Sequence, residues 1–383
     1  MKNKNRAGLS AGMAAAVTWF GFHCGSGFAT GRQMVQFTTR HGWAGVWIPV
    51  AIWAILGVFA YLSAEFTYLT HSKNYKEFTA GFFAPIGNVI VFIWDAIVAL
   101  GVFVAMGSVI AAAGDLFVSV FGISYWAGIV LFTALLLVCI IWGYNIITKL
   151  ASFVTVPMIA LLILTVILGI SYNFDNLKLV MSARPAIAEG SSVRAMFSDV
   201  ITYVGNQANF LPSLIAISGA FACERDVRTG TFCGALLNCL MHTAMVILVF
   251  SAYPWINSES LVVLGIIDKT PYSFLKIVYQ AVIFLALVST GVTLVYGAMS
   301  RFGALGKKIM PKDNTRKIFW AAVFIVGSVI VSSFGLAAIV KTGYKITGSL
   351  RLPVMVLPIF VLAPWRIHQA RSRKQAAEAA EAE

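Results

Sequence analysis

Charged residues are scarce in this chain of 383 residues: Asp, Glu, Lys and Arg together make up only 11% of it. A soluble globular protein carries about a quarter of such residues. The shortage is greatest for the acidic residues, of which there are 15 against 28 basic ones. So low a content of charge leaves little sequence for a water-exposed domain, and it excludes an ordinary soluble protein.

Cysteine is also rare, and the spacing of the five cysteines excludes two common roles. Cys24, Cys139, Cys223, Cys233 and Cys239 fall within or at the ends of apolar segments. They show neither the spacing of a metal site nor that of a disulfide framework. We interpret them as small buried hydrophobic residues.

The sequence lacks the motifs of the common enzyme classes. It contains no nucleotide-binding loop, nucleophile elbow or cluster of metal ligands. An intramembrane aspartyl protease is the enzyme alternative, because Asp95 and Asp115 occur in apolar surroundings. Both fall in one predicted helix, about 30 Å apart at the helical rise, and cannot form a catalytic pair. We therefore expect no enzyme and no organic cofactor.

Apolar residues dominate what is present, since 59% of the chain is hydrophobic. Runs of about 20 apolar residues, long enough to cross a bilayer, recur from end to end. The sequence predicts an all-α polytopic protein embedded in the lipid bilayer. The ten predicted spans are 8–38, 43–70, 85–118, 124–142, 144–172, 196–223, 229–254, 272–300, 317–338 and 342–365.

The basic residues predict the orientation of these spans. Most Lys and Arg residues fall in the segments on the same side as the N-terminus, and such segments are usually cytoplasmic. The net charge of +13 is thus attributed to these loops rather than to binding of nucleic acid. Both termini are expected in the cytoplasm. The predicted parts are a tail (1–6), a five-helix repeat (7–172), an outer loop (173–195), a second repeat (196–365) and a C-terminal tail (366–383).

Two predicted spans are interrupted by polar and helix-breaking residues. The first contains GFHCGSGFATG (21–31), and the sixth contains ITYVGNQANFLPSLIAISG (201–219). Irregular backbone at membrane depth persists only where it is buried in protein or lines a cavity. Close helix packing through small residues is the alternative for the glycines. The first and the sixth of ten spans occupy corresponding positions in two halves of five, a pattern typical of transporters built from inverted repeats.

At these residues the chain resembles the LeuT-fold transporters of the amino acid–polyamine–organocation superfamily. The stretch GSGFATGRQMVQF (25–37) is similar, more closely, to the bacterial YkvI-like membrane proteins. This resemblance implies a 5+5 inverted repeat of ten helices with helices 1 and 6 broken. It also implies a location in the bacterial inner membrane.

The resemblance further implies a sodium site between the first and the eighth spans. LeuT-like transporters bind this ion with backbone carbonyls of the first span and with a carbonyl and two hydroxyls of the eighth. The matching positions here are Gly21, Cys24, Ala286, Ser289 and Thr290. Back-bonding of the two hydroxyls to their own helix is the alternative. A second sodium site is not implied, because Phe28 stands where LeuT has an asparagine.

We expect a small solute to bind near mid-membrane, between residues 23–27 and 203–209. Amides, hydroxyls and a carboxylate suit a small polar or amine-bearing solute, and an amino acid is implied only by analogy with the family. The candidate substrate-binding residues are His23, Gly25, Ser26, Gly27, Asp95, Tyr203, Gly205, Asn206, Gln207 and Asn209.

Other ionisable residues leave alternatives open. Asp95, His23 or Lys149 could carry a proton in place of sodium. The resemblance implies that Glu65 braces the broken sixth helix, whereas Arg32 is either a gating residue or a solvated one. The predicted function is a sodium-coupled symporter of a small polar solute. A proton-coupled transporter, or a receptor or channel without coupled transport, is the alternative.

Overall fold

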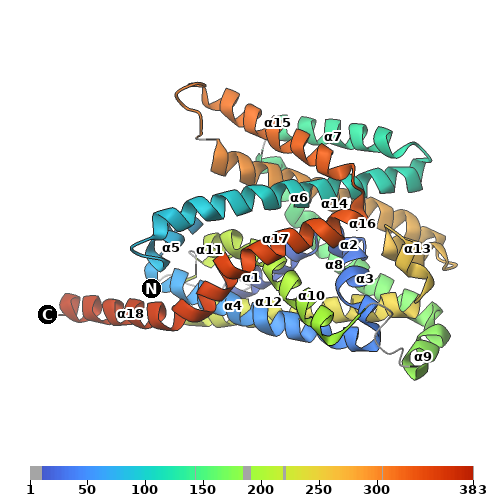
Figure 1. Cartoon of the computed structure of the whole chain (residues 1–383), viewed down its shortest axis with the longest axis horizontal. Helices are drawn as coiled ribbons and strands as arrows, with labels where there is room; N and C mark the ends of the chain where they lie inside the picture. Colours follow the sequence, from blue (N-terminus) through green and yellow to red (C-terminus); the bar gives the residue numbers. More distant parts are fainter. Residues whose placement is uncertain (1–10, 143, 184–190, 219–220, 304, 383) are drawn as a thin grey trace, which may run out of the picture.

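The computed structural model describes residues 11–142, 144–183, 191–218, 221–303 and 305–382. All the regular elements in this part of the chain are helices. The long ones are α4 (Ile48–Thr70), α6 (Gly87–Phe121), α7 (Tyr125–Trp142), α8 (Tyr144–Tyr172), α12 (Glu224–Ser251), α14 (Ser273–Phe302), α15 (Asp313–Ser332) and α18 (Leu357–Ala382). They lie side by side as an elongated bundle (Figure 1).

Shorter elements complete the chain, and the last four of them continue into α18 as one long apolar segment, Leu336–Ala376. They are η1 (Thr39–Trp47), α5 (Tyr75–Phe82), α9 (Phe174–Ala183), η3 (Trp255–Ser258), α13 (Val262–Asp268), α16 (Leu336–Ala338), η4 (Ile339–Gly343), α17 (Tyr344–Arg351) and η5 (Leu352–Val356). The α5 helix begins with Asn74, whose side-chain oxygen accepts a hydrogen bond from the backbone N–H of Glu77. Such capping explains why a helix starts here.

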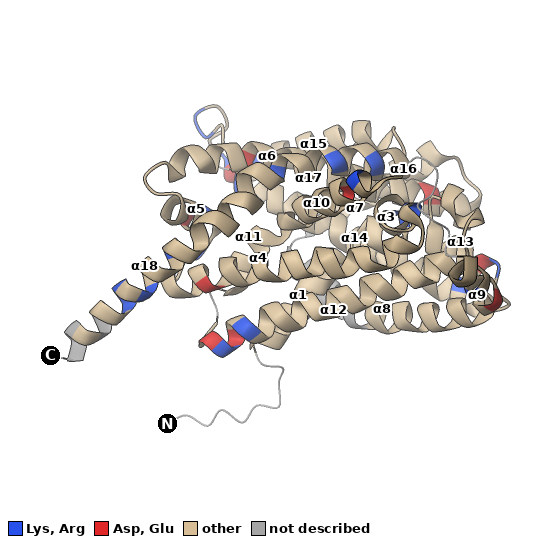
Figure 2. Ribbon diagram, turned by 60° about the horizontal axis from the view of Figure 1, so that its bottom comes forward, with Lys and Arg blue, Asp and Glu red and all other residues tan. Residues whose placement is uncertain are grey.

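Six helical segments in the described part of the chain are long and apolar enough to cross a membrane, or seven if one bent pair counts as a single span. The sequence predicted ten. The two interrupted spans are split into shorter helices, which a criterion of continuous length does not count. A third predicted span also falls short of the required length: the apolar helix described there covers only Tyr125–Cys139. The charged residues of α4 and α12 lie toward one end of these helices, as at the start of α12, and the middle of both helices is without charge (Figure 2).

The first predicted span is divided into α1 (Ala11–His23), α2 (Ser26–Ala29) and α3 (Arg32–Phe37). At the first division the N–H of Gly25 donates to the carbonyl of His23, 2.8 Å away, and not to the carbonyl of Gly21 as it would in a continuous helix. The second division is at Gly31, whose φ of 81° is readily adopted only by glycine. The glycine-rich stretch therefore opens the backbone as predicted.

The interruption of the sixth predicted span is milder. The segment consists of α10 (Val193–Gln207), the 3₁₀ turn η2 (Ala208–Phe210) and α11 (Leu211–Ser218). Pro212 has no N–H for the carbonyl of Ala208, which accepts from Leu211 in the tighter turn instead. The α-helix thus changes to one 3₁₀ turn and then resumes, without the gap in helical structure seen in the first span.

Close backbone contacts hold these segments in the bundle. The α10 helix packs on α17, where a Cβ added at Gly205 would lie 2.0 Å from the carbonyl oxygen of Gly348. The α1 helix packs on α12 in a similar way, with Gly12 against Gly230. Gly205 thus acts in helix packing, and it does not line the cavity described below.

We expect Gly205→Ala to separate α10 from α17 and to destabilise the protein by about 1–3 kcal/mol or more, because overpacked sites relax at such a cost. The measurement is the thermal unfolding midpoint of the detergent-purified protein. Gly297→Ala in α14 is the matched control, since a Cβ there meets no atom within 4 Å. Equal midpoints for the two variants would contradict this packing role.

Candidate functional site

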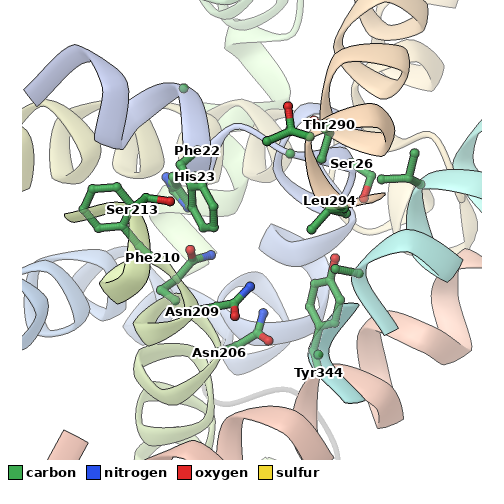
Figure 3. A pocket seen from close by; sticks show the side chains of 18 of the residues that line it. Phe22, His23, Ser26, Asn206, Asn209, Phe210, Ser213, Thr290, Leu294 and Tyr344 are labelled. Atoms are coloured by element: carbon green, nitrogen blue, oxygen red, sulfur yellow. The ribbon is translucent and has the colours of Figure 1, made fainter. Parts of the chain in front are cut away.

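A cavity of about 390 Å³ lies where the first span is interrupted. Side chains of α1, α10, η2, α14 and α17 converge on it (Figure 3). The polar residues of its wall are Thr18, His23, Ser26, Gln33, Asn206, Gln207, Asn209, Ser213, Ser289, Thr290, Thr293, Tyr344 and Arg351. Both interruptions thus contribute to one polar space within the bundle.

Most of the predicted substrate-binding residues line this cavity. They are His23, Gly25, Ser26, Gly27, Asn206, Gln207 and Asn209. Tyr203 and Gly205 do not line it: Tyr203 lies behind His23, and Gly205 lies at the contact with α17. The structure brings together residues that are about 180 positions apart in the sequence, as the pair His23 and Tyr203 shows.

His23 is buried and bonded to side chains of two other helices. Its Nδ1 lies 2.8 Å from Oδ1 of Asn238, and its Nε2 lies 2.6 Å from the hydroxyl of Tyr203. The amide of Asn238 donates to the carbonyl of Gly234, which turns its oxygen toward the imidazole. The Tyr203 hydroxyl oxygen also lies 3.0 Å from Oε1 of Gln33. This chain of hydrogen bonds joins α1 and α3 to α10 and α12.

The predicted sodium ligands fall into two groups. Gly21, Ser289 and Thr290 line the cavity, whereas Cys24 and Ala286 are buried and do not. A Cβ added at Gly25 would lie 3.9 Å from Cγ2 of Thr290, so the opened backbone faces α14 directly. The carbonyl of Gly21 does not accept the helical hydrogen bond from the N–H of Gly25, which donates to His23 instead. The first span and α14 thus lie against each other at the cavity, and the Thr290 atom nearest to Gly25 is its methyl carbon.

Hydroxyl groups connect the opened backbone to two further helices. Ser26 lies 2.8 Å from Ser108 of α6, measured between the Oγ atoms. The hydroxyl of Ser108 lies 2.9 Å from that of Tyr344 in α17. Ser26 and Tyr344 both face the cavity (Figure 3).

Asp95 lies outside the lining of the cavity and forms an ion pair. Its carboxylate accepts hydrogen bonds from Nε of Arg301, at 2.5 Å, and from Nη2 of the same side chain. The hydroxyl of Tyr75 in α5 donates to the same carboxylate. The pairing explains how an acidic residue is kept in an apolar helix, and it leaves Asp95 engaged away from the cavity.

The other ionisable residues singled out in the sequence also have specific partners. Glu65 pairs with Arg371 of α18, with 2.6 Å between Oε1 and Nη2, where the resemblance implied a contact with the broken sixth helix. Arg32 donates to the backbone carbonyls of Asn257 and Glu259, at 2.7 and 3.0 Å. The side chain of Lys149 lies outside the part of the chain that the structure describes.

Arg351 is a residue of the cavity that the sequence interpretation missed. It is 1% exposed and lies at the end of α17. The signal was available, because a lone arginine in the middle of a predicted span is costly unless it serves a site. Among the described residues, no group of His, Cys, Asp and Glu side chains could hold a metal ion.

The comparison of sequences gives one distant relative, and no family model matches the chain. The chain is 29% identical over 155 residues to the "Uncharacterized membrane protein YkvI" of Bacillus subtilis (strain 168). The match covers 40% of this chain and 43% of YkvI, so it spans less than half of that relative's length.

The comparison of structures covers nearly the whole chain. MhsT in complex with L-phenylalanine has a TM-score of 0.62 at 14% identity, over 96% of this chain and 99% of MhsT. Inward-facing Mhp1 has a TM-score of 0.55 at 15% identity, over 98% and 97% of the two chains. A manganese transporter of Eremococcus coleocola has a TM-score of 0.52 at 13% identity, over 91% and 78%.

These likenesses are too low in identity to define a substrate, but they define the fold. It is the fold of these three proteins, as the resemblance to LeuT-like transporters implies. The chain is an all-helical, multi-pass membrane protein with the fold of LeuT-like transporters, and it is distantly similar in sequence to YkvI.

Proposed function

We propose that this protein is a secondary active transporter that couples the uptake of a small polar solute to sodium and works by alternating access. The observation that carries the proposal is the cavity at the opened first span, where backbone and hydroxyl oxygens face a polar space. In transporters of this architecture, substrate and coupling ion bind at such interrupted helices. The proposal includes ten spans in two inverted repeats of five and both termini in the cytoplasm of a bacterium.

Sodium is the proposed coupling ion because the ligands are oxygen atoms without formal charge. The proposed ligands remain Gly21, Cys24, Ala286, Ser289 and Thr290. Neutral oxygens suit a hard monovalent cation, whereas calcium usually has carboxylate ligands. The described part of the chain contributes no Asp or Glu to the lining of the cavity. The same fact disfavours a divalent metal as the solute, although one similar structure is that of a manganese transporter.

The solute is proposed to lie between residues 23–27 and 203–209. A volume of about 390 Å³ lies within the range of pockets for small molecules. An amino acid is a reasonable first candidate, because the similar protein MhsT was solved with L-phenylalanine. Proton coupling through His23 is the second candidate, favoured by the hydrogen-bonded chain from His23 through Tyr203 to Gln33.

We expect an inward sodium gradient to drive accumulation of a solute into vesicles that contain the purified protein, at equal pH on both sides. The solute is first selected by its stabilisation of the protein against heat in the presence of sodium, because a ligand of the folded state raises the unfolding midpoint. Accumulation is then measured with labelled solute under sodium and proton gradients in turn. Uptake that follows the proton gradient and ignores sodium would replace the sodium proposal with the second candidate.

A further inference from the structure

Arg351 lines the cavity, and none of the described residues around this cavity is acidic. Arg351 is 1% exposed, and neither Asp nor Glu occurs among the residues that line the cavity. Among the described residues, no salt bridge involves it. The positive charge in this space is therefore not balanced by any side chain that the structure describes.

The hydrogen bonds of Arg351 are incomplete. Its Nη1 donates to the backbone carbonyl and to Oδ1 of Asn206, over 3.4 and 3.2 Å, and its Nε is buried without a partner. A guanidinium offers five N–H groups, and a buried unpaired charge is strongly unfavourable. The side chain is consequently left with unused donors inside a polar cavity.

Arg316 shows what a purely structural arginine looks like in the same protein. It is also buried, at 5% exposed. Its Nε donates to the carbonyl of Gly303, and its Nη1 donates to those of Met310 and Pro311, all within 2.9 Å. Its Nη2 pairs with Asp313 at 2.8 Å. The contrast indicates that the missing partner of Arg351 comes from outside the chain.

The surroundings hold Arg351 in a defined position. A Cβ added at Gly101 would fall 1.8 Å from its Nη2, so the absence of a side chain there makes room for the guanidinium. Asn206 is itself held, because its Oδ1 accepts a hydrogen bond of 3.1 Å from the hydroxyl of Thr347. The donors are thus oriented before any ligand arrives, which reduces the entropy lost on binding.

We propose that the transported solute carries a carboxylate or a similar anionic group and that Arg351 binds this group inside the cavity. The inference rests on the proposed function and names the class of its substrate. Arginine suits this task because its planar fork matches a carboxylate with two parallel hydrogen bonds. The amides of Asn206 and Asn209 and the hydroxyl of Tyr344, which face the same space, then contact the rest of the solute (Figure 3).

The test compares carboxylic acids with their uncharged amides on the purified full-length protein. Amino acids, 2-oxo acids and monocarboxylates are each titrated beside the corresponding amide at constant sodium, and the thermal unfolding midpoint is recorded. At least one acid should raise the midpoint while its amide does not. In Arg351→Met, the concentration of that acid needed for the same rise should increase roughly tenfold or more.

The unfolding midpoints of the ligand-free variants distinguish an effect on binding from an effect on folding. Arg351→Met should keep or raise the midpoint of the ligand-free protein, because it removes an uncompensated buried charge. Arg316→Met, the matched control, should lower it and leave the response to the acid unchanged. A midpoint of Arg351→Met that falls as far as that of Arg316→Met would show that Arg351 is structural.

The remaining outcomes have separate meanings. A rise caused by sodium chloride alone and lost in Arg351→Met would identify an inorganic anion as the ligand and overturn the proposal. So would a panel in which no acid raises the midpoint. Accumulation under a sodium gradient of a solute that has no carboxylate or other anionic group would overturn the anionic substrate and leave the transporter function standing. Failure of every solute to accumulate, with an intact Arg351-dependent response to an acid, would reject transport and retain the anion site.

Discussion

Gly25→Leu is expected to abolish solute uptake while the protein remains folded. Gly25 lies in the wall of the cavity, at the point where the first span opens. A Cβ alone would fit there, since its nearest neighbour is Cγ2 of Thr290 at 3.9 Å. The further atoms of leucine would occupy the space between the opened backbone and α14. A steric cost of about 3 kcal/mol already corresponds to roughly a hundredfold loss of affinity.

Two controls accompany this variant in vesicle uptake and thermal-shift measurements. Gly25→Ala should retain most of the uptake, because its backbone has a φ of −79° that any residue adopts and its Cβ has room. Gly297→Leu places the same side chain in α14 outside the cavity, where a Cβ meets no atom within 4 Å, and should retain uptake too. Full uptake by Gly25→Leu would show that the solute binds elsewhere.

Removal of the two hydroxyls of α14 is expected to weaken sodium binding and so to raise the sodium concentration that uptake requires. The double variant Ser289→Ala with Thr290→Val deletes two of the proposed oxygen ligands and changes the volume of the side chains little. The carbonyl of Gly21, released by the turn of the Gly25 N–H toward His23, would be left to bind the ion with fewer partners. The sodium concentration for half-maximal uptake should rise by roughly tenfold or more.

Thr293→Val is the matched control for this experiment. Thr293 lines the same cavity one turn further along α14, but its hydroxyl already donates to the carbonyl of Ser289 at 2.8 Å. Its loss should leave the sodium dependence as in the wild type. Unchanged sodium dependence in the double variant would refute the ion site, and His23→Gln would then test the proton-coupled alternative.

The interruptions were predictable because their causes are local. Glycine permits the positive φ of Gly31, and proline cannot supply the N–H that the carbonyl of Ala208 would need. Both effects act within one turn of helix and can be deduced from a short stretch of sequence. The expectation of a broken first span is confirmed on this ground, and the sixth is interrupted more gently than predicted.

The roles of the ionisable residues were harder to predict because their partners are distant in the sequence. Asp95 is neutralised by Arg301, some two hundred residues away, and Glu65 by Arg371, about three hundred residues away. An isolated acidic residue in an apolar span gives no indication of whether a cation or a solute will pair with it. Arg351 is the reverse case, because the sequence did not single it out. Only the structure shows that its Nε is buried without a partner.

The sequence by itself determined the class of the protein and the place of its opened backbone, because the cost of burying charge and the conformational limits of glycine and proline depend on composition and on near neighbours. The tertiary structure alone decided which side chains meet in the cavity, which charges are neutralised by the protein, and which remains available. These outcomes depend on the packing of helices far apart in the chain, such as α10 on α17, and local sequence does not encode them residue by residue.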